Sequence, residues 1–313
     1  MTITVIKPGL QSTIQSRPRV GLRYQGIPAS GAADPLSLAL ANRLLGNEWD
    51  APALEATLLG PTLRFDRECA FAVTGAVAVL TLNGDEIQAH ESRTASAGDE
   101  LSIGAAEVGA RMYFAVTGGF AADDILGSSS TNLQAGFGGL QGRALLPGDV
   151  LRCDPGVVES AKTPDEFRLP MSSTRALRTC TTRETDLLDA DSLGYLFNTN
   201  WTVARRADRM GVRLEGPRLA VSSDGRMPSA GVIPGTIQCP EDGSPYVLSV
   251  DAGTVGGYPR IAQVARVDRH VLGQLRPGDH VRLLRREPDD AVVELRAKLA
   301  YWREWLPDID EVL

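Results

Sequence analysis

The chain is most informative between residues 205 and 264, where it reads RRADRMGVRLEGPRLAV (205–221) and then SAGVIPGTIQCPEDGSPYVLSVDAGTVGGYPRIAQV (229–264). Short β-branched runs alternate there with glycines, which permit positive φ, and with prolines, which set turns. A continuous helix is incompatible with that spacing. We therefore expect short β-strands joined by elaborate connections.

The same stretch places arginines, carboxylates and amides in the expected connections. Guanidinium groups bind carboxylates and other small anions through forked hydrogen bonds, so we predict a small-molecule site here. The candidate catalytic acid–base residues are Asp208, Glu215 and Asp251. The candidate substrate-binding residues are Arg205, Arg209, Arg213, Gln238, Thr254, Tyr258 and Arg260. The alternative is that these residues cap turns and form surface ion pairs, because Asp and Arg beside glycine are common in β connections.

Length and charge restrict the class of protein. A chain of 313 residues fits two domains, given roughly 100–200 residues per domain. The formal net charge of −7 without a basic tail argues against nucleic acid or an anionic membrane surface as a partner. No apolar run approaches the roughly 20 residues of a membrane span, and the first residues lack the apolar segment of a signal peptide. A cytoplasmic protein without a membrane partner is expected.

Several site types are excluded by missing patterns. The four cysteines are far apart and the three histidines have no ligand spacing, so we expect reduced, packed thiols and no metal. The chain has no phosphate-binding loop of the type G-x-x-x-x-G-K-[ST] and no G-x-S-x-G nucleophile elbow. Any nucleotide or acyl chemistry would need another arrangement.

Strand signals dominate the remaining sequence. The segment 71–90, FAVTGAVAVLTLNGDEIQAH, reads as a strand, a turn and then a hairpin closed at Asn83-Gly84, which suits a type I′ turn. Only two helices are predicted. One is capped by Asp34 with Pro35 at its first position, and the other begins at Pro288 and places Val292, Leu295, Leu299 and Trp302 on one stripe.

Repeated phrases indicate two related β units. A Gly-Asp turn followed by a strand recurs as AGDELSI (97–103), PGDVLRC (147–153) and PGDHVRL (277–283), and LLGPTLRF (58–65) is echoed by LEGPRLAV (214–221). Between the halves the chain is polar and rich in proline. We therefore predict a β-barrel-like domain at 1–154, a linker at 155–174, and a second barrel domain with a terminal helix at 175–313.

Several longer phrases occur in one order: QGIPASGAAD (25–34), ANRLLGN (41–47), GFGGL (136–140), DRMG (208–211), PGTIQ (234–238) and GGYP (256–259). With them the chain resembles the family called allophanate hydrolase subunit 2, or biotin-dependent carboxyltransferase-like proteins, from about Ile6 to Leu284. That family includes the C subunit of bacterial 5-oxoprolinase and an antagonist of a sporulation-kinase inhibitor. The resemblance implies a mainly β protein with two cyclophilin-like β-barrel domains and few short helices. Asp34, which ends the first phrase, is also counted among the substrate-binding candidates.

The resemblance implies a subunit of an ATP-dependent complex that opens the lactam of 5-oxoproline to glutamate. The expected partners are a smaller sister subunit of related fold and a third 5-oxoprolinase subunit, with ATP as the co-substrate of the complex. Two alternatives stay open. The chain could be a carboxyltransferase-like component served by a biotin carrier on another protein, since no lysine lies between methionines here to carry biotin. It could also be a non-enzymatic protein that sequesters the sister subunit.

Three departures from the family pattern leave the substrate open. The family phrase Gln-Asp-x-Gly-Arg-Pro-Gly appears as QSRPRVG (15–21), which puts Ser16 in place of Asp. The phrase Gly-Ser-Arg-Ser-Thr appears as GSSST (127–131), which puts Ser129 in place of Arg, and Thr182-Arg183 stand where relatives tend to have Gly-Pro. If these positions bind substrate in relatives, this chain has a different substrate or has lost activity.

Overall fold

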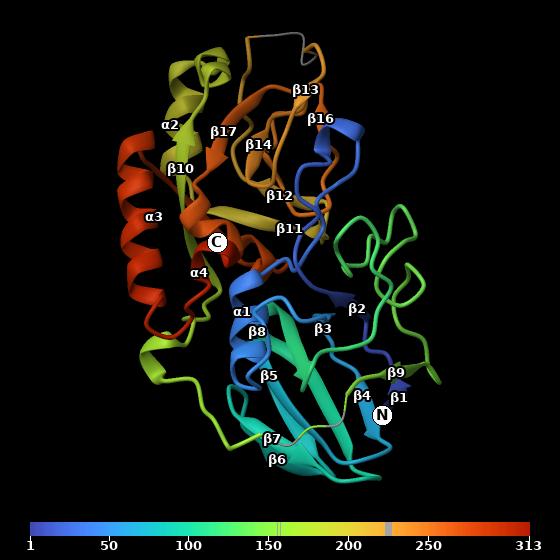
Figure 1. Cartoon of the computed structure of the whole chain (residues 1–313). Helices are drawn as coiled ribbons and strands as arrows, with labels where there is room; N and C mark the ends of the chain where they lie inside the picture. Colours follow the sequence, from blue (N-terminus) through green and yellow to red (C-terminus); the bar gives the residue numbers. More distant parts are fainter. Residues whose placement is uncertain (155, 157, 223–226) are drawn as a thin grey trace. The chain divides into compact units, whose positions relative to one another are not determined.

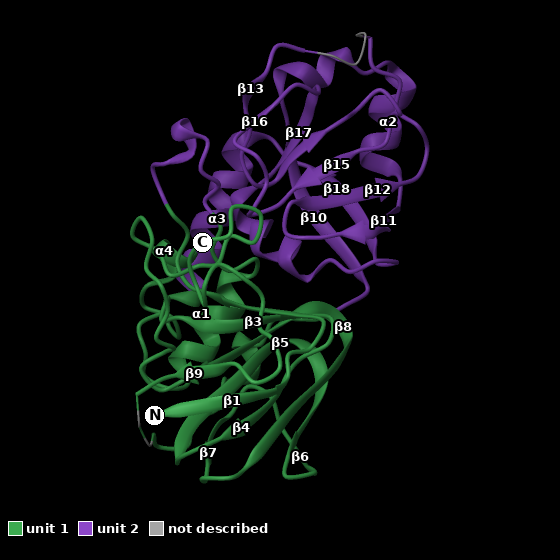
Figure 2. Cartoon of the chain, turned by 90° about the vertical axis from the view of Figure 1, so that its right-hand side faces the viewer, with its two compact units in different colours: residues 1–19, 30–171, 302–312 green, residues 20–29, 172–301, 313 purple. Residues whose placement is uncertain are grey.

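The computed structural model describes residues 1–154, 156, 158–222 and 227–313. It forms two units (Figure 2): unit 1 comprises residues 1–19, 30–171 and 302–312, and unit 2 comprises residues 20–29, 172–301 and 313. The chain therefore leaves unit 1 for residues 20–29, returns to it at residue 30, leaves it again for residues 172–301, and returns to it for residues 302–312. The described residues of the predicted linker belong to unit 1 as far as Met171.

Unit 1 is built on one antiparallel sheet of nine strands that curls around its core (Figure 1). The strand order is β2-β3-β8-β4-β1-β9, and the long strand β5 pairs with β6, β7 and β8. Phenylalanine rings fill the interior, with centroids of Phe65 and Phe71 5.4 Å apart and those of Phe71 and Phe114 5.9 Å apart. The strands are β1 (Thr2–Lys7), β2 (Gln11–Gln15), β3 (Ala53–Thr57), β4 (Thr62–Phe65), β5 (Cys69–Leu82), β6 (Asp85–Ile87), β7 (Ser92–Ala95), β8 (Glu100–Val116) and β9 (Val150–Arg152).

Strand β5 corrects one sequence prediction. The expected turn after FAVTG does not form, and residues 69–82 are one strand. Gly75 has φ of +96°, and the pairing with β8 shifts register between Gly75 and Val77. A Cβ at Gly75 would lie 2.4 Å from the carbonyl oxygen of Arg111. Gly75 thus bends the strand at a bulge without ending it, while the hairpin at Asn83-Gly84 is confirmed by positive φ at both residues.

Unit 2 contains a closed seven-stranded barrel in the order β10-β17-β14-β15-β12-β11-β18. Strands β10 and β18 are parallel, and the remaining barrel pairs are antiparallel. Trp201, Leu214, Ile237, Ile261 and Leu283 are fully buried inside it. The strands are β10 (Thr174–Thr181), β11 (Trp201–Ala207), β12 (Gly211–Glu215), β14 (Thr236–Gln238), β15 (Tyr246–Leu248), β17 (Arg260–Val264) and β18 (His280–Arg285), and outside the barrel β13 (Ala230–Gly231) pairs with β16 (Val255–Gly256).

The mainly β class with few short helices is confirmed. Helix α1 (Pro35–Arg43) begins as predicted, with the Asp34 side chain accepting a hydrogen bond from the Ser37 N–H at 3.1 Å. Helix α3 (Pro288–Trp302) also begins as predicted, but of its expected apolar stripe Trp302 is buried while Val292 is 45% exposed. The other helical elements are α2 (Ala190–Asn198), α4 (Ile309–Val312), η1 (Arg23–Gln25), η2 (Asp165–Phe167), η3 (Arg183–Leu187) and η4 (Arg266–Gln274).

The three Gly-Asp turns have the same geometry. In each, the glycine has φ near +90° (Gly98 +91°, Gly148 +86°, Gly278 +89°). In each, the Asp carboxylate accepts a hydrogen bond from the N–H three residues earlier, and a strand follows directly: β8, β9 or β18. The other echoed phrase does not keep its structure, because β4 follows Gly60-Pro61 whereas residues 218–220 after Gly216-Pro217 form no strand.

Candidate functional site

The connection between β11 and β12 carries the central residues of the predicted site. Asp208 stabilises this turn, since its carboxylate accepts hydrogen bonds from the N–H groups of Met210 at 2.7 Å and Gly211 at 3.2 Å. Gly211 must be small, because a Cβ there would lie 2.4 Å from the carbonyl oxygen of Val247. The turn thereby aims the side chain of Arg209 inward, where it is only 4% exposed.

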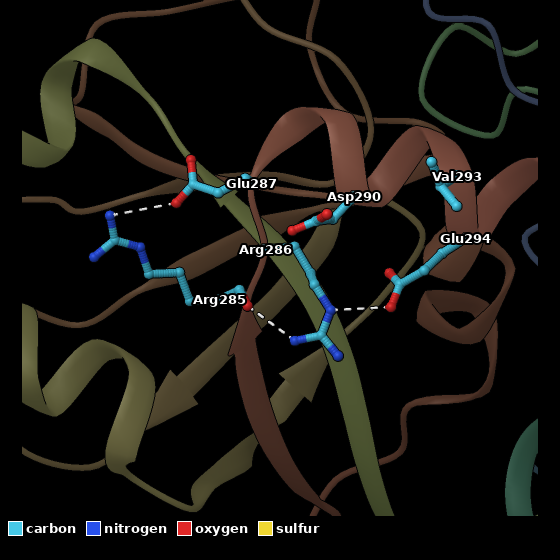
Figure 3. A pocket seen from close by; sticks show the side chains of 6 residues that line it. All are labelled: Arg285, Arg286, Glu287, Asp290, Val293 and Glu294. Atoms are coloured by element: carbon cyan, nitrogen blue, oxygen red, sulfur yellow. Dashed lines mark hydrogen bonds and ion pairs between the residues drawn. The ribbon is translucent and has the colours of Figure 1, made fainter.

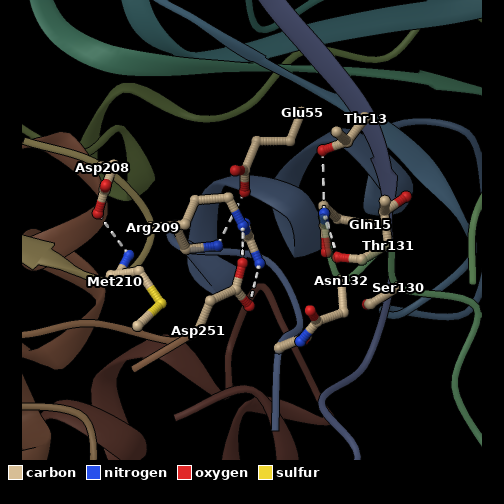
Figure 4. A network of polar contacts seen from close by, with 12 residues as sticks. Thr13, Gln15, Glu55, Ser130, Thr131, Asn132, Asp208, Arg209, Met210 and Asp251 are labelled. Atoms are coloured by element: carbon tan, nitrogen blue, oxygen red, sulfur yellow. Dashed lines mark hydrogen bonds and ion pairs between the residues drawn. The ribbon is translucent and has the colours of Figure 1, made fainter. Parts of the chain in front are cut away.

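Arg209 forms a bidentate ion pair with Asp251 (Figure 4). Its Nε lies 2.6 Å from Oδ2 and its Nη2 3.1 Å from Oδ1 of that carboxylate. The backbone repeats the contact, because the Asp251 N–H donates to the Arg209 carbonyl at 2.8 Å. Asp251 is itself 5% exposed. A planar guanidinium held at two edges has one orientation, which is what recognition of a planar anion or amide requires.

Gln238 contacts the far end of the segment 249–258, which also carries Asp251. It is 6% exposed on β14 and its Nε2 lies 3.4 Å from the carbonyl oxygen of Tyr258. Gly256 makes room for it, because a Cβ at that residue would lie 2.4 Å from the Gln238 Nε2. Thr254 is buried and the side chain of Tyr258 is 46% exposed. The segment 249–258 thus carries Asp251, Thr254 and Tyr258. It contacts Arg209 through Asp251 and Gln238 through Tyr258.

Two predicted arginines are engaged in ion pairs elsewhere in unit 2. Arg260 binds Glu184 through its Nε at 2.9 Å and through its own backbone N–H at 2.5 Å, and this contact lowers the pKa of the Glu184 carboxyl. Arg213 lies 2.7 Å from Asp242, with both side chains nearly half exposed. For these two residues the geometry matches the alternative of turn and surface ion pairs.

The remaining candidates are Arg205, Glu215 and Asp34. Arg205 and Glu215 are exposed on β11 and β12. Asp34 belongs to unit 1, where its carboxylate accepts hydrogen bonds from the Ser37 hydroxyl at 2.5 Å and the Ser37 N–H.

Unit 1 contains a buried polar network that the sequence did not reveal, apart from Asp34. Register places Thr13, Glu55 and Tyr113 side by side across β2, β3 and β8. Glu55, 1% exposed, accepts hydrogen bonds from the Tyr113 hydroxyl at 2.7 Å and the Ala33 N–H at 2.8 Å. Arg111 lies on the same face of β8, with its Nε 3.3 Å from Glu55 Oε1. Burial and the neighbouring Glu55 carboxylate raise the pKa of Tyr113 well above its ordinary value, so Tyr113 remains a hydrogen-bond donor.

The network continues through amides and hydroxyls (Figure 4). Gln15, fully buried on β2, donates from Nε2 to the Thr13 hydroxyl at 2.9 Å and to the Thr131 carbonyl at 3.2 Å. Asn132 donates to the hydroxyl of Ser30, a residue with φ of +53°. The network draws on β2, β3, β8 and the loop residues Ser30, Thr131 and Asn132, so no single local motif contains it. The signal available was the pair Leu54-Glu55, a charged residue within an apolar strand.

Two of the three family departures meet in this region. The Ser129 N–H donates to the Ser16 hydroxyl at 3.2 Å, and the Ser16 N–H donates to the Ser130 hydroxyl at 2.8 Å. Ser16 is 4% exposed. The two positions at which the family resemblance led us to expect Asp and Arg are therefore spatial neighbours. Here a pair of small neutral residues occupies them, so the two departures form one structural change.

One cavity of unit 2 is lined by other residues than the candidates. A cavity of about 500 Å³ in unit 2 is lined by Arg285, Arg286, Glu287, Asp290, Val293 and Glu294, none of them predicted site residues (Figure 3). Among the described residues, no group of three or more His, Cys, Asp or Glu side chains could hold a metal ion. In the described part of the chain, no helix has both the length and the apolar character to cross a membrane.

Comparison with known proteins identifies the family. A family model described as the carboxyltransferase domain, subdomain A and B, matches residues 25–285. The chain belongs to this family. The matched region includes the Arg209–Asp251 pair and, of the Glu55 network, Glu55, Arg111 and Tyr113, whereas Thr13 and Gln15 precede it.

Relatives of this carboxyltransferase-family chain differ in length. It is 33% identical over 302 residues to the C subunit of 5-oxoprolinase from Escherichia coli (strain K12), covering 96% of this chain and 97% of that protein. It superposes on the crystal structure of Kluyveromyces lactis urea amidolyase with a TM-score of 0.90 and 29% identity, covering all of this chain but 20% of the other. With the solved protein TTHA0988 the TM-score is 0.81 at 33% identity, covering 90% of this chain and 55% of that one.

Proposed function

We propose that this chain is a subunit of an ATP-dependent complex that hydrolyses a cyclic amide, converting 5-oxo-L-proline, ATP and water to L-glutamate, ADP and phosphate. The observation that carries this proposal is the match with the C subunit of E. coli 5-oxoprolinase, which spans nearly all of both chains. By contrast, the chain spans only a fifth of the urea amidolyase. Because a relative of nearly the same length is named as a subunit, we propose that this chain is also a separate subunit of a complex.

The unit 2 geometry supports recognition of such a substrate. A 5-oxoproline molecule has a carboxylate and a planar lactam, which suit a fixed guanidinium and a primary amide. In this proposal Asp251 orients Arg209, Arg209 and Gln238 hold the substrate, and Thr254 and Tyr258 complete the contacts. Of the acid–base candidates, Asp208 is adjacent to Arg209 in the sequence and Asp251 is bonded to its side chain.

The chemistry of the lactam explains why the proposed reaction needs ATP. A lactam is a poor electrophile, and transfer of the γ-phosphoryl group to its oxygen creates a leaving group. A first water then adds at that carbon and the C–N bond breaks, which leaves an acyl phosphate. A second water hydrolyses the acyl phosphate to the glutamate carboxylate and free phosphate. ATP is proposed as a co-substrate of the complex, with a smaller sister subunit of related fold and a third subunit, and no residue of this chain is assigned to it.

A second candidate is a carboxyltransferase component of a biotin-dependent carboxylase. It is favoured by the family description and by the TM-score of 0.90 with urea amidolyase. In that reading the Arg209 site receives a carboxyl group from biotin on a carrier encoded elsewhere. The two candidates differ in what the assembled protein needs: a lactam in the first, and a biotinylated carrier in the second.

Reconstitution with the sister subunits tests the proposal. ADP release is measured with and without 5-oxoproline for the native chain, for Arg209→Lys and for Arg282→Lys. Lysine keeps the charge beside Asp251 but loses the fork, so lactam-dependent turnover is expected to fall at least about 100-fold. Arg282, exposed on β18, is the control and should keep native turnover. An assembled complex that transfers a carboxyl group from biotin, and shows no lactam-dependent ADP release, would replace the first function by the second.

A further inference from the structure

Three segments of unit 2 form an exposed surface almost without charge. Residues 20–29, 227–236 and 252–259 contain no Asp, Glu or Lys and a single arginine, Arg23, although 23% of the whole chain is charged. We call these three segments the uncharged surface. A solvated face of an acidic protein normally carries charges of both signs. The lack of charge therefore needs an explanation other than solubility.

Hydrogen bonds hold the three segments together. The Arg23 Nη2 donates to the carbonyl oxygens of Val232 at 2.6 Å and Gly253 at 3.0 Å, which ties η1 to the β13–β16 pair. Gly231 pairs with Val255 across these two strands. The one charged side chain of the surface is thus used to join its parts. Burial lowers the pKa of Arg23, as expected for a guanidinium that serves as an internal link.

Large apolar side chains project from this surface into solvent. Tyr24 is 83% exposed, Val20 79%, Val255 63%, Tyr258 46% and Ile233 42%. Single exposed apolar residues are ordinary, but several on segments that carry a single charged residue are typical of a protein-binding surface. The centres of such interfaces lack charge and are enriched in tyrosine.

We propose that the uncharged surface is the docking site for another protein subunit of the same complex, one that presents an apolar face with little charge. This inference rests on the proposed function only in that it requires a complex. The relatives argue for a different polypeptide as the occupant. The E. coli relative is named as a subunit, and the chain accounts for only 55% of TTHA0988, so the same fold occurs there with a further region attached.

The uncharged surface overlaps the candidate site, because it includes Thr254 and Tyr258. Val255 follows Thr254 directly, and Gly256 contacts the Gln238 side chain. A partner bound to Val255 and Tyr258 would therefore cover the segment 249–258 that carries Asp251. Docking would remove water from the surroundings of Arg209 and Gln238, which strengthens their hydrogen bonds to a bound substrate. Assembly and substrate binding would then favour each other.

Matched substitutions test the docking site. Val255→Asp and Tyr24→Asp place a carboxylate on the uncharged surface, and Val293→Asp does the same on α3, where Val293 is 64% exposed. The probe is the purified sister subunit of the same organism, titrated into each variant by calorimetry. We expect the first two variants to bind at least about 30-fold more weakly and Val293→Asp to stay within about threefold of native. Circular dichroism and thermal unfolding check that all three variants fold.

Two results would overturn the docking site. Equal binding by all three variants would place the sister subunit elsewhere. A dimer of the chain alone in light scattering, dissociated by Val255→Asp while the sister subunit still binds, would assign the surface to self-association. Failure of the catalytic proposal can be distinguished from failure of the docking site, because Arg209→Lys should retain binding of the sister subunit whether or not its turnover falls.

Discussion

Two buried ion pairs, one in each unit, are held in place in different ways. Glu55 and Arg111 lie on neighbouring strands of the unit 1 sheet, and the Glu55 carboxylate also accepts hydrogen bonds from Tyr113 and the Ala33 N–H. Arg209 and Asp251 lie on two connections of unit 2, and a forked side-chain contact and a backbone hydrogen bond join them. The first pair is positioned by strand register and the second by turn geometry.

The difference separates scaffold from site. A buried pair set in a sheet with additional donors resists removal of either partner, because the remaining charge stays in a dry interior. A pair on connections has backbone that can adjust and bring in water. We therefore expect substitutions at Glu55–Arg111 to act mainly on folding, and substitutions at Arg209–Asp251 to act mainly on binding and turnover.

The largest expected effect breaks the unit 1 pair. Arg111→Met keeps the length of the side chain but leaves the Glu55 carboxylate buried without its cation. The free energy of unfolding should fall by about 4 kcal/mol, measured by urea denaturation. Arg64→Met, on an exposed position of β4, is the control. A loss below about 1 kcal/mol would show that Glu55 does not depend on the Arg111 guanidinium.

The second effect concerns the Ser16–Ser129 contact. Ser16→Asp alone introduces a buried carboxylate and should cost about 3 kcal/mol of unfolding free energy. Adding Ser129→Arg restores the residue types of the family pattern and should recover at least half of that loss. A thermodynamic cycle of both single variants and the double variant measures the coupling. Strictly additive losses would mean that the two departures are independent.

The third effect tests the unit 2 pair by the same kind of change. Asp251→Asn keeps the shape of the side chain and leaves Arg209 charged, so the unfolding free energy should fall by only about 2 kcal/mol. Lactam-dependent turnover should fall far more than this loss of stability explains. A stability loss equal to that of Arg111→Met would erase the distinction between scaffold and site.

The smallest expected effect is on the pH dependence of stability, to which one histidine in each unit contributes. Burial, with Arg168 nearby, lowers the pKa of His90 from 6.5 to about 4, and burial with Lys298 nearby lowers the pKa of His270 further. The unfolded chain therefore binds protons first as pH falls below 6.5, and stability should decline between pH 6.5 and about 4. His90→Asn, which suits the φ of +63° there, should remove about 1 kcal/mol of that decline one pH unit below 6.5. Denaturation curves at pH 7.5 and 5.5 measure it, and an unchanged decline would exclude His90.

Local features of the fold could be predicted, and distant ones could not. Asp34-Pro35, Pro288 and the Gly-Asp turns act through their own backbone, so their structures follow from a few adjacent residues. The bulge at Gly75 depends on the close approach of Arg111 in another strand, and the sequence therefore suggested a turn.

The candidate site shows the same limit. Arg209, Asp251 and Gln238 stood out because glycines and prolines surround them. The pairing of Arg260 with Glu184 joins residues 76 positions apart, so its structural role was hidden. The Glu55 network was hidden for the same reason, since β2, β3 and β8 each contribute to it.

The order of segments along the chain has a consequence for synthesis. Residues 302–312 belong to unit 1, although the ribosome makes them after unit 2. Leu306 and Ile309 in this segment are buried, and Arg43 of α1 donates a hydrogen bond to the Trp305 carbonyl at 3.1 Å. Until that segment emerges, nascent unit 1 exposes the apolar surface that it will cover. Unit 1 therefore completes its packing only after unit 2 has been translated, and the interval between the two is when a chaperone would be needed.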